Sequence, residues 1–278
     1  MAIDTYLAQK CTEDLPILRF YRWSPHAISL GYGQKIDDID LRTCQQDNIP
    51  VVRRPTGGRA VLHAEEVTYA VIIPKDSPWY HEQILETYHF ISQGLVAGFR
   101  ALNVDVSLER RTYSNTQYAE KSLLGAPCFS ASAQYEIVYQ GRKIVGSAQR
   151  RFDKAILQHG SILNGSRHLA LLKYLNNLNK DVRQRLQEVL EKKTLSISQI
   201  LNKQIPYGDI VQSFKKGFID EYQLTFVDKS FAAQELSEIN HIKTNFPNLW
   251  RRFHERQIDS YAGARLNTCP GWQRSGSS

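Results

Sequence analysis

Two segments of the sequence bring together residue types that can do chemistry. The first runs from Arg53 to His63 and reads Arg-Arg-Pro-Thr-Gly-Gly-Arg-Ala-Val-Leu-His, at the end of a predicted strand. Adjacent glycines let backbone amides come close to a ligand, because no Cβ intervenes, and the flanking arginines can hold a negative group. A tight, charged turn between two strands fits the same residues, so the spacing alone leaves both interpretations open.

The second segment runs from Cys128 to Leu163. It places a cysteine before one predicted strand, Lys143 on the next, and a His-Gly pair at His159 in a third. In an antiparallel meander these three points can converge. A lone cysteine is most often a small buried apolar residue, but a nearby ammonium group favours the thiolate, which is the nucleophilic form.

The elements that position these segments follow from hydrophobic period and turn signals. We expect helices over residues 2–11, 40–47 and 81–101, and strands over 16–23, 26–32, 49–54, 67–73, 135–139, 143–149 and 155–163. Gln140-Gly141 is predicted to form the turn between the strands 135–139 and 143–149. Residues 108–126 have no period and predict an exposed, mobile loop. Beyond residue 168 the chain is predicted to be mainly helical, with helices over 208–222, 230–240 and 245–254 and one short strand at 224–226. Strands with helices between and after them, without regular βαβ alternation, predict an α+β fold.

Composition limits the class of protein. The 278 residues are 42% apolar and 23% charged, which is ordinary for a globular chain that buries a core. Four widely separated cysteines without a CxxC pair favour free thiols and a reducing cytoplasm. No apolar run approaches the length of a membrane span, and no signal peptide is recognisable. The formal charge of +7 favours an acidic partner, but no basic stripe with interleaved aromatic residues suggests nucleic acid.

Several common cofactor motifs are absent from the sequence. The segment Gly31-Tyr-Gly33-Gln-Lys-Ile stops short of GxGxxG, and no GxxxxGK[ST] loop occurs. No histidine and cysteine spacing forms a recognisable zinc set, and no GxSxG elbow is present. We therefore expect no metal and no nucleotide held in a Rossmann or P-loop fold.

Three ordered motifs, however, resemble one known family. Arg-Pro-Thr-Gly-Gly-Arg-Ala-Val-Leu-His, Gly-Arg-Lys143-Ile-Val-Gly-Ser-Ala-Gln and Leu-Gln-His159-Gly-Ser-Ile-Leu are similar to the biotin/lipoate protein ligase superfamily over roughly residues 1–190. With Pro-Cys128-Phe before Tyr135-Glu136, they look most like its cysteine-dependent octanoyltransferases of lipoate assembly. The resemblance implies a mixed, largely antiparallel sheet flanked by helices over 1–190, with a helical region, 191–278, packed on it and ending in a frayed tail.

The resemblance also implies roles for individual residues. Cys128 becomes the acyl-thioester nucleophile, and Lys143 becomes the residue that lowers its pKa. The predicted substrate-binding residues are Arg54, Thr56, Gly57, Gly58, Arg59, His63, Gly146, Ser147, His159 and Gly160. Each histidine also fits a structural role bonded to backbone. For the acyl tail we expect an apolar slot at Val61, Ile73, Ile144 and Val145, from their places on strands.

The implied reaction moves an octanoyl or lipoyl group from acyl carrier protein to a lysine of a lipoyl domain or of the glycine cleavage H protein. It needs no cofactor. Three alternatives remain open: an ATP- and magnesium-dependent lipoate (or biotin) ligase, an amidotransferase between lipoyl domains, and a non-catalytic binder of lipoyl domains. Cys128 distinguishes a transferase from a ligase, because an enzyme that activates its substrate as an acyl-adenylate has no use for this cysteine. One departure concerns the start of the chain: family members usually carry a strand before the helix that begins here at Met1, so we expect a trimmed start or a bare sheet edge.

Overall fold

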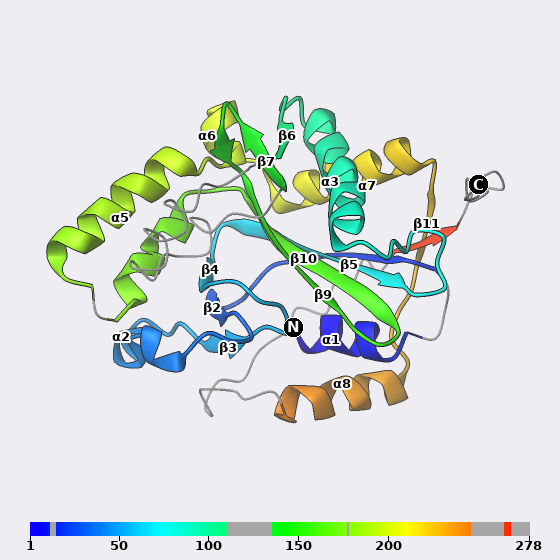
Figure 1. Ribbon diagram of the computed structural model, residues 1–278, viewed down its shortest axis with the longest axis horizontal. Coiled ribbons are helices and arrows are strands. Elements are labelled where there is room, and N and C mark those ends of the chain that lie inside the picture. The colour runs from blue at the N-terminus through cyan, green and yellow to red at the C-terminus, as the bar shows by residue number, and fades with distance from the viewer. Residues whose placement is uncertain (12–14, 111–134, 177, 246–263, 268–278) are drawn as a thin grey trace.

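The computed structural model describes residues 1–11, 15–110, 135–176, 178–245 and 264–267. Its centre is a six-stranded sheet in the order β11-β12-β1-β5-β10-β9, in which neighbouring strands are antiparallel (Figure 1). The strands are β1 (Ile17–Tyr21), β5 (Glu66–Pro74), β9 (Val145–Arg151), β10 (Ala155–Leu163), β11 (Thr225–Asp228) and β12 (Ala264–Asn267). The longest ladder joins β5 to β10 over nine residue pairs, so the sheet is built around these two strands.

Two layers of helices cover this sheet (Figure 1). One face carries α3 (Ile84–Ala101) and α7 (Tyr207–Tyr222), and the other carries α1 (Ala2–Gln9) with α8 (Ala233–Asn245) beyond it. Alternate residues of β5 serve the two layers: Val71 and Ile73 pack in the α3–α7 core, whereas Ala70 and Ile72 pack with Ala8 of α1. This period of two is what a strand buried on both faces requires.

Two three-stranded sheets flank the central one. The first has the order β3-β2-β4, made of β2 (Ala27–Leu30), β3 (Val51–Arg53) and β4 (Val61–His63), with β2 and β3 parallel. It packs against α2 (Leu41–Gln46), the 3₁₀ helix η3 (Arg167–Tyr174) and α5 (Lys180–Lys193), while a short 3₁₀ turn, η1, spans Ile36–Asp38. The second has the order β6-β7-β8, made of β6 (Ser107–Arg110), β7 (Tyr135–Tyr139) and β8 (Arg142–Lys143).

The structure confirms the α+β class and corrects four details. The predicted strand 143–149 is divided at Ile144, because the Ile144 amide bonds Ile137 while its carbonyl accepts from Leu163. Lys143 therefore ends the small sheet, and β9 begins in the large one. Residues 108–110 belong to β6, where pairing with β7 orders them, rather than to a loop; residues 111–126 lie outside the described residues. No strand bounds were predicted for β4 or β12, and β12 pairs with β1 along the edge that faces away from β5. The expected trimmed start or bare sheet edge stays a prediction.

Two helices of the C-terminal region pack directly on the core of the central sheet. Ile197 of α6 (Ile197–Leu201) and Phe214 and Phe218 of α7 belong to the same buried cluster as β5 and α3. Glycines allow the backbones of α7 and α3 to approach closely, since a Cβ on Gly217 would lie 2.1 Å from the Gly98 nitrogen. The predicted helix 245–254 lies outside the described residues except for Asn245, and the boundary at residue 190 stays a prediction.

Candidate active site

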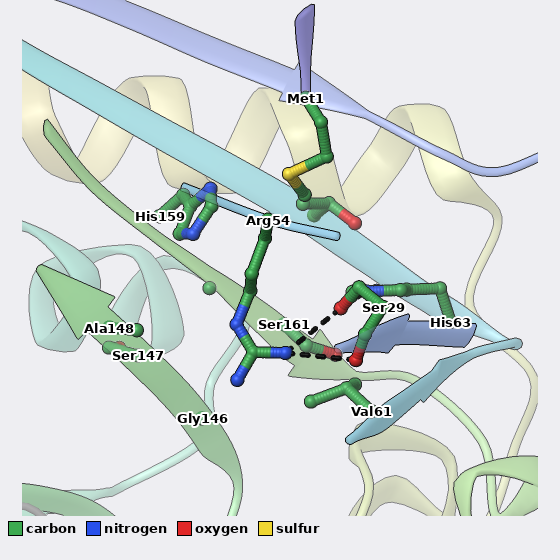
Figure 2. Close-up of a pocket in the computed structure, with 12 residues that line it drawn as sticks. Met1, Ser29, Arg54, Val61, His63, Gly146, Ser147, Ala148, His159 and Ser161 are labelled. Carbon is green, nitrogen blue, oxygen red and sulfur yellow. Dashed lines mark hydrogen bonds between the residues drawn. The ribbon is translucent and has the colours of Figure 1, made fainter. Parts of the chain in front are cut away.

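A cavity lies where the β3-β2-β4 sheet meets strands β5, β9 and β10 of the central sheet (Figure 2). Its volume is about 30 Å³. The residues that line it are Met1, Ser29, Arg54, Val61, His63, Thr68, Gly146, Ser147, Ala148, His159, Gly160 and Ser161.

Arg54 lies in the wall of this cavity and is only 4% exposed. Its guanidinium donates five hydrogen bonds to neighbouring protein oxygens. Nε and Nη2 bond the Gly57 carbonyl at 3.2 and 2.9 Å, Nη2 bonds the Arg59 carbonyl at 2.7 Å, and Nη1 bonds the Ser29 carbonyl and Oγ at 2.9 and 3.1 Å. A guanidinium has five N–H donors. Arg54 therefore holds the Pro-Thr-Gly-Gly loop (residues 55–58) in place and adds a positive charge to the wall.

The loop approaches a second backbone segment so closely that glycine is required there. Gly58 has a φ of +96°, a conformation that favours glycine. A Cβ on Gly31, after β2, would lie 1.9 Å from the Gly58 carbonyl oxygen. This contact, with the Arg54 bonds, fixes the path of the predicted Gly57-Gly58 motif.

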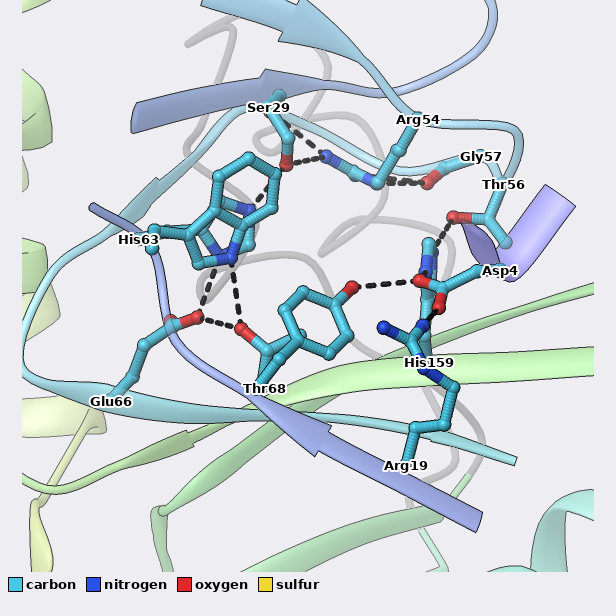
Figure 3. A network of polar contacts seen from close by, with 12 residues as sticks. Asp4, Arg19, Ser29, Arg54, Thr56, Gly57, His63, Glu66, Thr68 and His159 are labelled. Atoms are coloured by element: carbon cyan, nitrogen blue, oxygen red, sulfur yellow. Dashed lines mark hydrogen bonds and ion pairs between the residues drawn. The ribbon is translucent and has the colours of Figure 1, made fainter. Parts of the chain in front are cut away.

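A chain of polar contacts runs along one side of the cavity (Figure 3). Ser29 Oγ lies 2.7 Å from His63 Nε2, and His63 Nδ1 lies 2.6 Å from Glu66 Oε1. The hydroxyls of Thr68 and Ser161 also donate to the Glu66 carboxylate. All five side chains are buried. Trp23 stacks on the His63 ring, with centroids 4.4 Å apart, and fixes the plane of the imidazole.

His159 occupies the other side of the cavity, on β10. Its Nε2 lies 2.6 Å from the Thr56 hydroxyl, and its Nδ1 is 3.7 Å from Asp4, too far for a hydrogen bond. Burial lowers the pKa of His159, so its imidazole is neutral at pH 7. Asp4 instead receives bonds from Arg19 and Tyr21. Burial, the largest single effect, raises the pKa of Asp4, but the charges of Arg19 and the N-terminal ammonium, together with His159, outweigh burial and hold that pKa well below its usual range.

Glycines and a serine complete the wall formed by β9 and β10. A Cβ on Gly160 would lie 2.3 Å from the Gly146 carbonyl oxygen, so glycine is needed where these strands approach. The Ser147 hydroxyl accepts a hydrogen bond of 2.7 Å from Tyr69. The structure thus places the predicted Gly146, Ser147 and Gly160 together with both histidines.

Lys143 is not among the residues that line this cavity. It is buried on β8, where its Nζ lies 3.1 Å from Glu136 Oε1 of β7. Cys128 lies outside the described residues. The expected meeting of Cys128, Lys143 and His159 therefore stays a prediction. Of the four residues expected to form the apolar slot, Val61 lines the cavity, whereas Ile73, Ile144 and Val145 pack in the main core.

Several polar residues at the site were not predicted from the sequence: Ser29, Asp4, Glu66, Glu136 and Ser161. For Glu66 a signal was present, because it follows His63 by three residues in a segment that is otherwise mostly apolar. For Ser29 and Asp4 nothing local distinguishes them, since their partners come from strands far along the chain.

Similarity to known proteins identifies the class of protein to which this fold and cavity belong. The model of the lipoyl protein ligase A/B catalytic domain matches residues 1–219, and the chain belongs to this family. Octanoyltransferase LipM of Exiguobacterium sp. is 35% identical over 91% of this chain and 93% of that protein. The LipM of Bacillus subtilis is 34% identical over 82% of both chains. The expected class of enzyme, an acyltransferase, is confirmed by these relatives.

Solved structures confirm the fold. A bipartite lipoate protein ligase from Thermoplasma acidophilum, studied with its E2 lipoyl domain, aligns with a TM-score of 0.69 at 18% identity over 91% of this chain and 92% of that one. Lipoate-protein ligase A bound with ATP aligns with a TM-score of 0.66 at 19% identity over 88% of each chain. Among the helices that the structure describes, none has the length and apolar character needed to cross a membrane.

Proposed function

We propose that the protein transfers an octanoyl group from acyl carrier protein, through a thioester on Cys128, to a lysine of a lipoyl domain. The glycine cleavage H protein is a second acceptor of the same kind. The main support for this proposal is the cavity between His63, His159 and the loop that Arg54 holds. This cavity lies in a chain that shares about a third of its residues with octanoyltransferases of nearly equal length. We expect the reaction to take place in the cytoplasm.

The chemistry requires no nucleotide. Exchange of an acyl group between two thiols is nearly neutral in free energy, and its transfer from a thioester to an amine is downhill. A buried ammonium such as Lys143 favours the thiolate of a neighbouring cysteine. We assign that role to Lys143, with Glu136 holding its Nζ in place at 3.1 Å. In the sequence, Lys143 lies on the hairpin that begins seven residues after Cys128, at Tyr135.

Partner recognition is supported by charge and by the fold. The chain has a net charge of +7, which favours encounter with an acidic carrier protein. One structural neighbour was studied with its E2 lipoyl domain, which agrees with a lipoyl domain as the acceptor.

The test is the intact mass of the protein after incubation with octanoyl-acyl carrier protein in the absence of ATP. We expect an octanoyl adduct that hydroxylamine removes, present in the parent and absent in Cys128→Ala. Cys11→Ala, which removes a half-buried thiol at the end of α1, is the matched control and should keep the adduct. An adduct on both cysteine variants would contradict the assignment of Cys128. Modification of a lipoyl domain only when ATP and free octanoic acid are added would identify a ligase instead.

A further inference from the structure

Three arginines lie beside the cavity, and all three are partly exposed. Arg150 follows Ala148, which lines the cavity, by two residues on β9 and therefore lies on the same face of that strand. Arg150 Nη1 donates to the Pro55 carbonyl at 2.8 Å, so this side chain reaches from β9 to the Pro-Thr-Gly-Gly loop. Arg53 precedes and Arg59 follows the segment that includes the same loop.

The charges of these three arginines are not neutralised by the rest of the described chain. None of the three forms an ion pair with a carboxylate of the described residues. Arg53 Nη1 donates at 2.8, 2.9 and 2.7 Å to three carbonyls of the loop after β2, those of Gly31, Tyr32 and Gln34. The Arg59 guanidinium has neither a hydrogen bond nor an ion pair with any residue that the structure describes. The surface beside the cavity is therefore positively charged, which favours a partner that presents carboxylates.

An exposed aromatic ring lies next to these charges. Among the large apolar and aromatic side chains that the structure describes, that of Tyr32 is the most exposed, at 63%. The Arg150 guanidinium lies 4.9 Å from the centre of the Tyr32 ring, and the Tyr32 amide donates to the Thr56 carbonyl at 2.8 Å. These contacts hold the ring beside the loop. Tyrosine and arginine are enriched at the centres of protein–protein interfaces, so this combination is typical of a surface that binds another protein.

We propose that the acceptor domain docks on a surface, the acceptor surface, made of Tyr32, Arg53, Arg59 and Arg150. The inference rests on the proposed acyl transfer at this cavity. Reach favours the acceptor over the donor as the occupant. The acceptor lysine has a stem of only four carbons, so its domain must lie against the surface beside the cavity for the amine to enter. Acyl carrier protein holds its acyl group at the end of a long flexible arm, so its body need not touch this surface.

The charge of the acceptor surface selects among lysines. A lysine ammonium that approaches three guanidinium groups is repelled, because like charges face each other. Carboxylates beside the lysine on the acceptor reverse this effect, since each can pair with a guanidinium through charge-assisted hydrogen bonds. An acceptor domain with acidic residues around its lysine is therefore bound, whereas a lysine on a neutral or basic surface is rejected.

The test is a single turnover of the isolated octanoyl-enzyme with a lipoyl domain that has carboxylates beside its lysine. Varying the concentration of the lipoyl domain separates the half-saturating concentration from the maximal rate. Arg59 is the position to change, because its guanidinium has no partner in the described chain and its loss removes no internal contact. We expect Arg59→Gln to raise the half-saturating concentration about threefold and Arg59→Glu about tenfold, while the maximal rate changes less than about twofold.

A charge swap and a matched control separate docking from folding. A lipoyl domain whose carboxylates beside the lysine are replaced by lysine should be a better acceptor for Arg59→Glu than for the parent. Arg100→Gln removes the same charge from an exposed position at the end of α3, on the other face of the central sheet, and should behave like the parent. Added salt should weaken acceptor binding by the parent more than by Arg59→Gln. If Arg59→Glu does not fold, Arg59→Gln and Arg150→Gln decide the question in its place.

The outcomes distinguish the docking surface from the proposed function. An octanoyl-enzyme that forms normally, with an unchanged half-saturating concentration of the lipoyl domain in the Arg59 variants, overturns the acceptor surface and leaves the acyl transfer intact. A loss confined to the formation of the octanoyl-enzyme does the same, because it assigns this surface to acyl carrier protein. Failure of the parent protein to form any octanoyl-enzyme overturns the acyl transfer and the acceptor surface together.

Discussion

Replacing Gly217 by alanine tests how α7 is attached to the catalytic core. The new Cβ would lie 2.1 Å from the Gly98 nitrogen and 2.6 Å from the Ala97 carbonyl carbon, so both obstructing atoms are backbone of α3. A side chain could rotate away, but a helix backbone cannot. The two helices must therefore separate by more than about 1 Å to restore ordinary contact.

The magnitude follows from two opposing effects. Forcing extra atoms into a packed core costs about 1–3 kcal/mol, and backbone atoms on both sides place Gly217 at the upper end of that range. Alanine in place of glycine stabilises a helix by about 1 kcal/mol, which partly offsets this cost. We expect a net loss of about 2 kcal/mol in the free energy of unfolding.

Gly208 provides the matched control on the same helix. No atom lies within 4 Å of a Cβ built there, so Gly208→Ala should be neutral or stabilising by up to about 1 kcal/mol. The assay is urea unfolding followed by circular dichroism and by tryptophan fluorescence. Trp79 reports on α7 because its ring lies 5.1 Å from that of Tyr222. Coincident transitions are expected, since α7 shares one core with the sheet. Equal stabilities for the two alanine variants would refute the reasoning.

Three further predictions concern the cavity loop and the buried ionisable groups. Gly31→Ala should displace the Pro-Thr-Gly-Gly loop and reduce the rate of transfer at least about tenfold in a steady-state assay, which corresponds to about 1.4 kcal/mol of lost transition-state stabilisation. Gly33→Ala is the control, because no atom lies within 4 Å of a Cβ built there, and it should leave activity unchanged. Equal activities of the two variants would contradict the role of the loop. Because the pKa of Asp4 is depressed in the folded state, its pairing with Arg19 stabilises the protein above about pH 4 and is lost as the pH falls further, so Asp4→Asn should be less stable than the parent at pH 7 and closer to it at pH 3 in urea unfolding. Burial lowers the pKa of His168 to about 4. As the pH is lowered from 6.5 to 4, this group should therefore reduce the free energy of unfolding by at most about 1.4 kcal/mol per pH unit. If a His168→Gln variant lost stability equally steeply with falling pH, His168 would not be the source of the effect.

Local pattern was sufficient for much of the fold. Helical spacing predicted α1, α3 and α7 to within a few residues, since their apolar faces recur at the helical period. The turn at Gln140-Gly141 was also predicted, and both residues have positive φ. The break at Ile144 was not predictable, because it comes from a change of partner strand that leaves no mark in the residue types.

The sequence by itself determined the family motifs, the need for glycine in the Pro-Thr-Gly-Gly loop, and the residues that can act as nucleophile, cation and base. Only the tertiary structure decided which of them meet. The β2–β4 register pairs Ala27 with His63 and Ser29 with Val61. Because side chains alternate between faces along a strand, this register puts Ser29 and His63 on one face, 34 residues apart in sequence. A shift of one residue would have turned His63 away from the cavity, and no local signal in the sequence fixes that register.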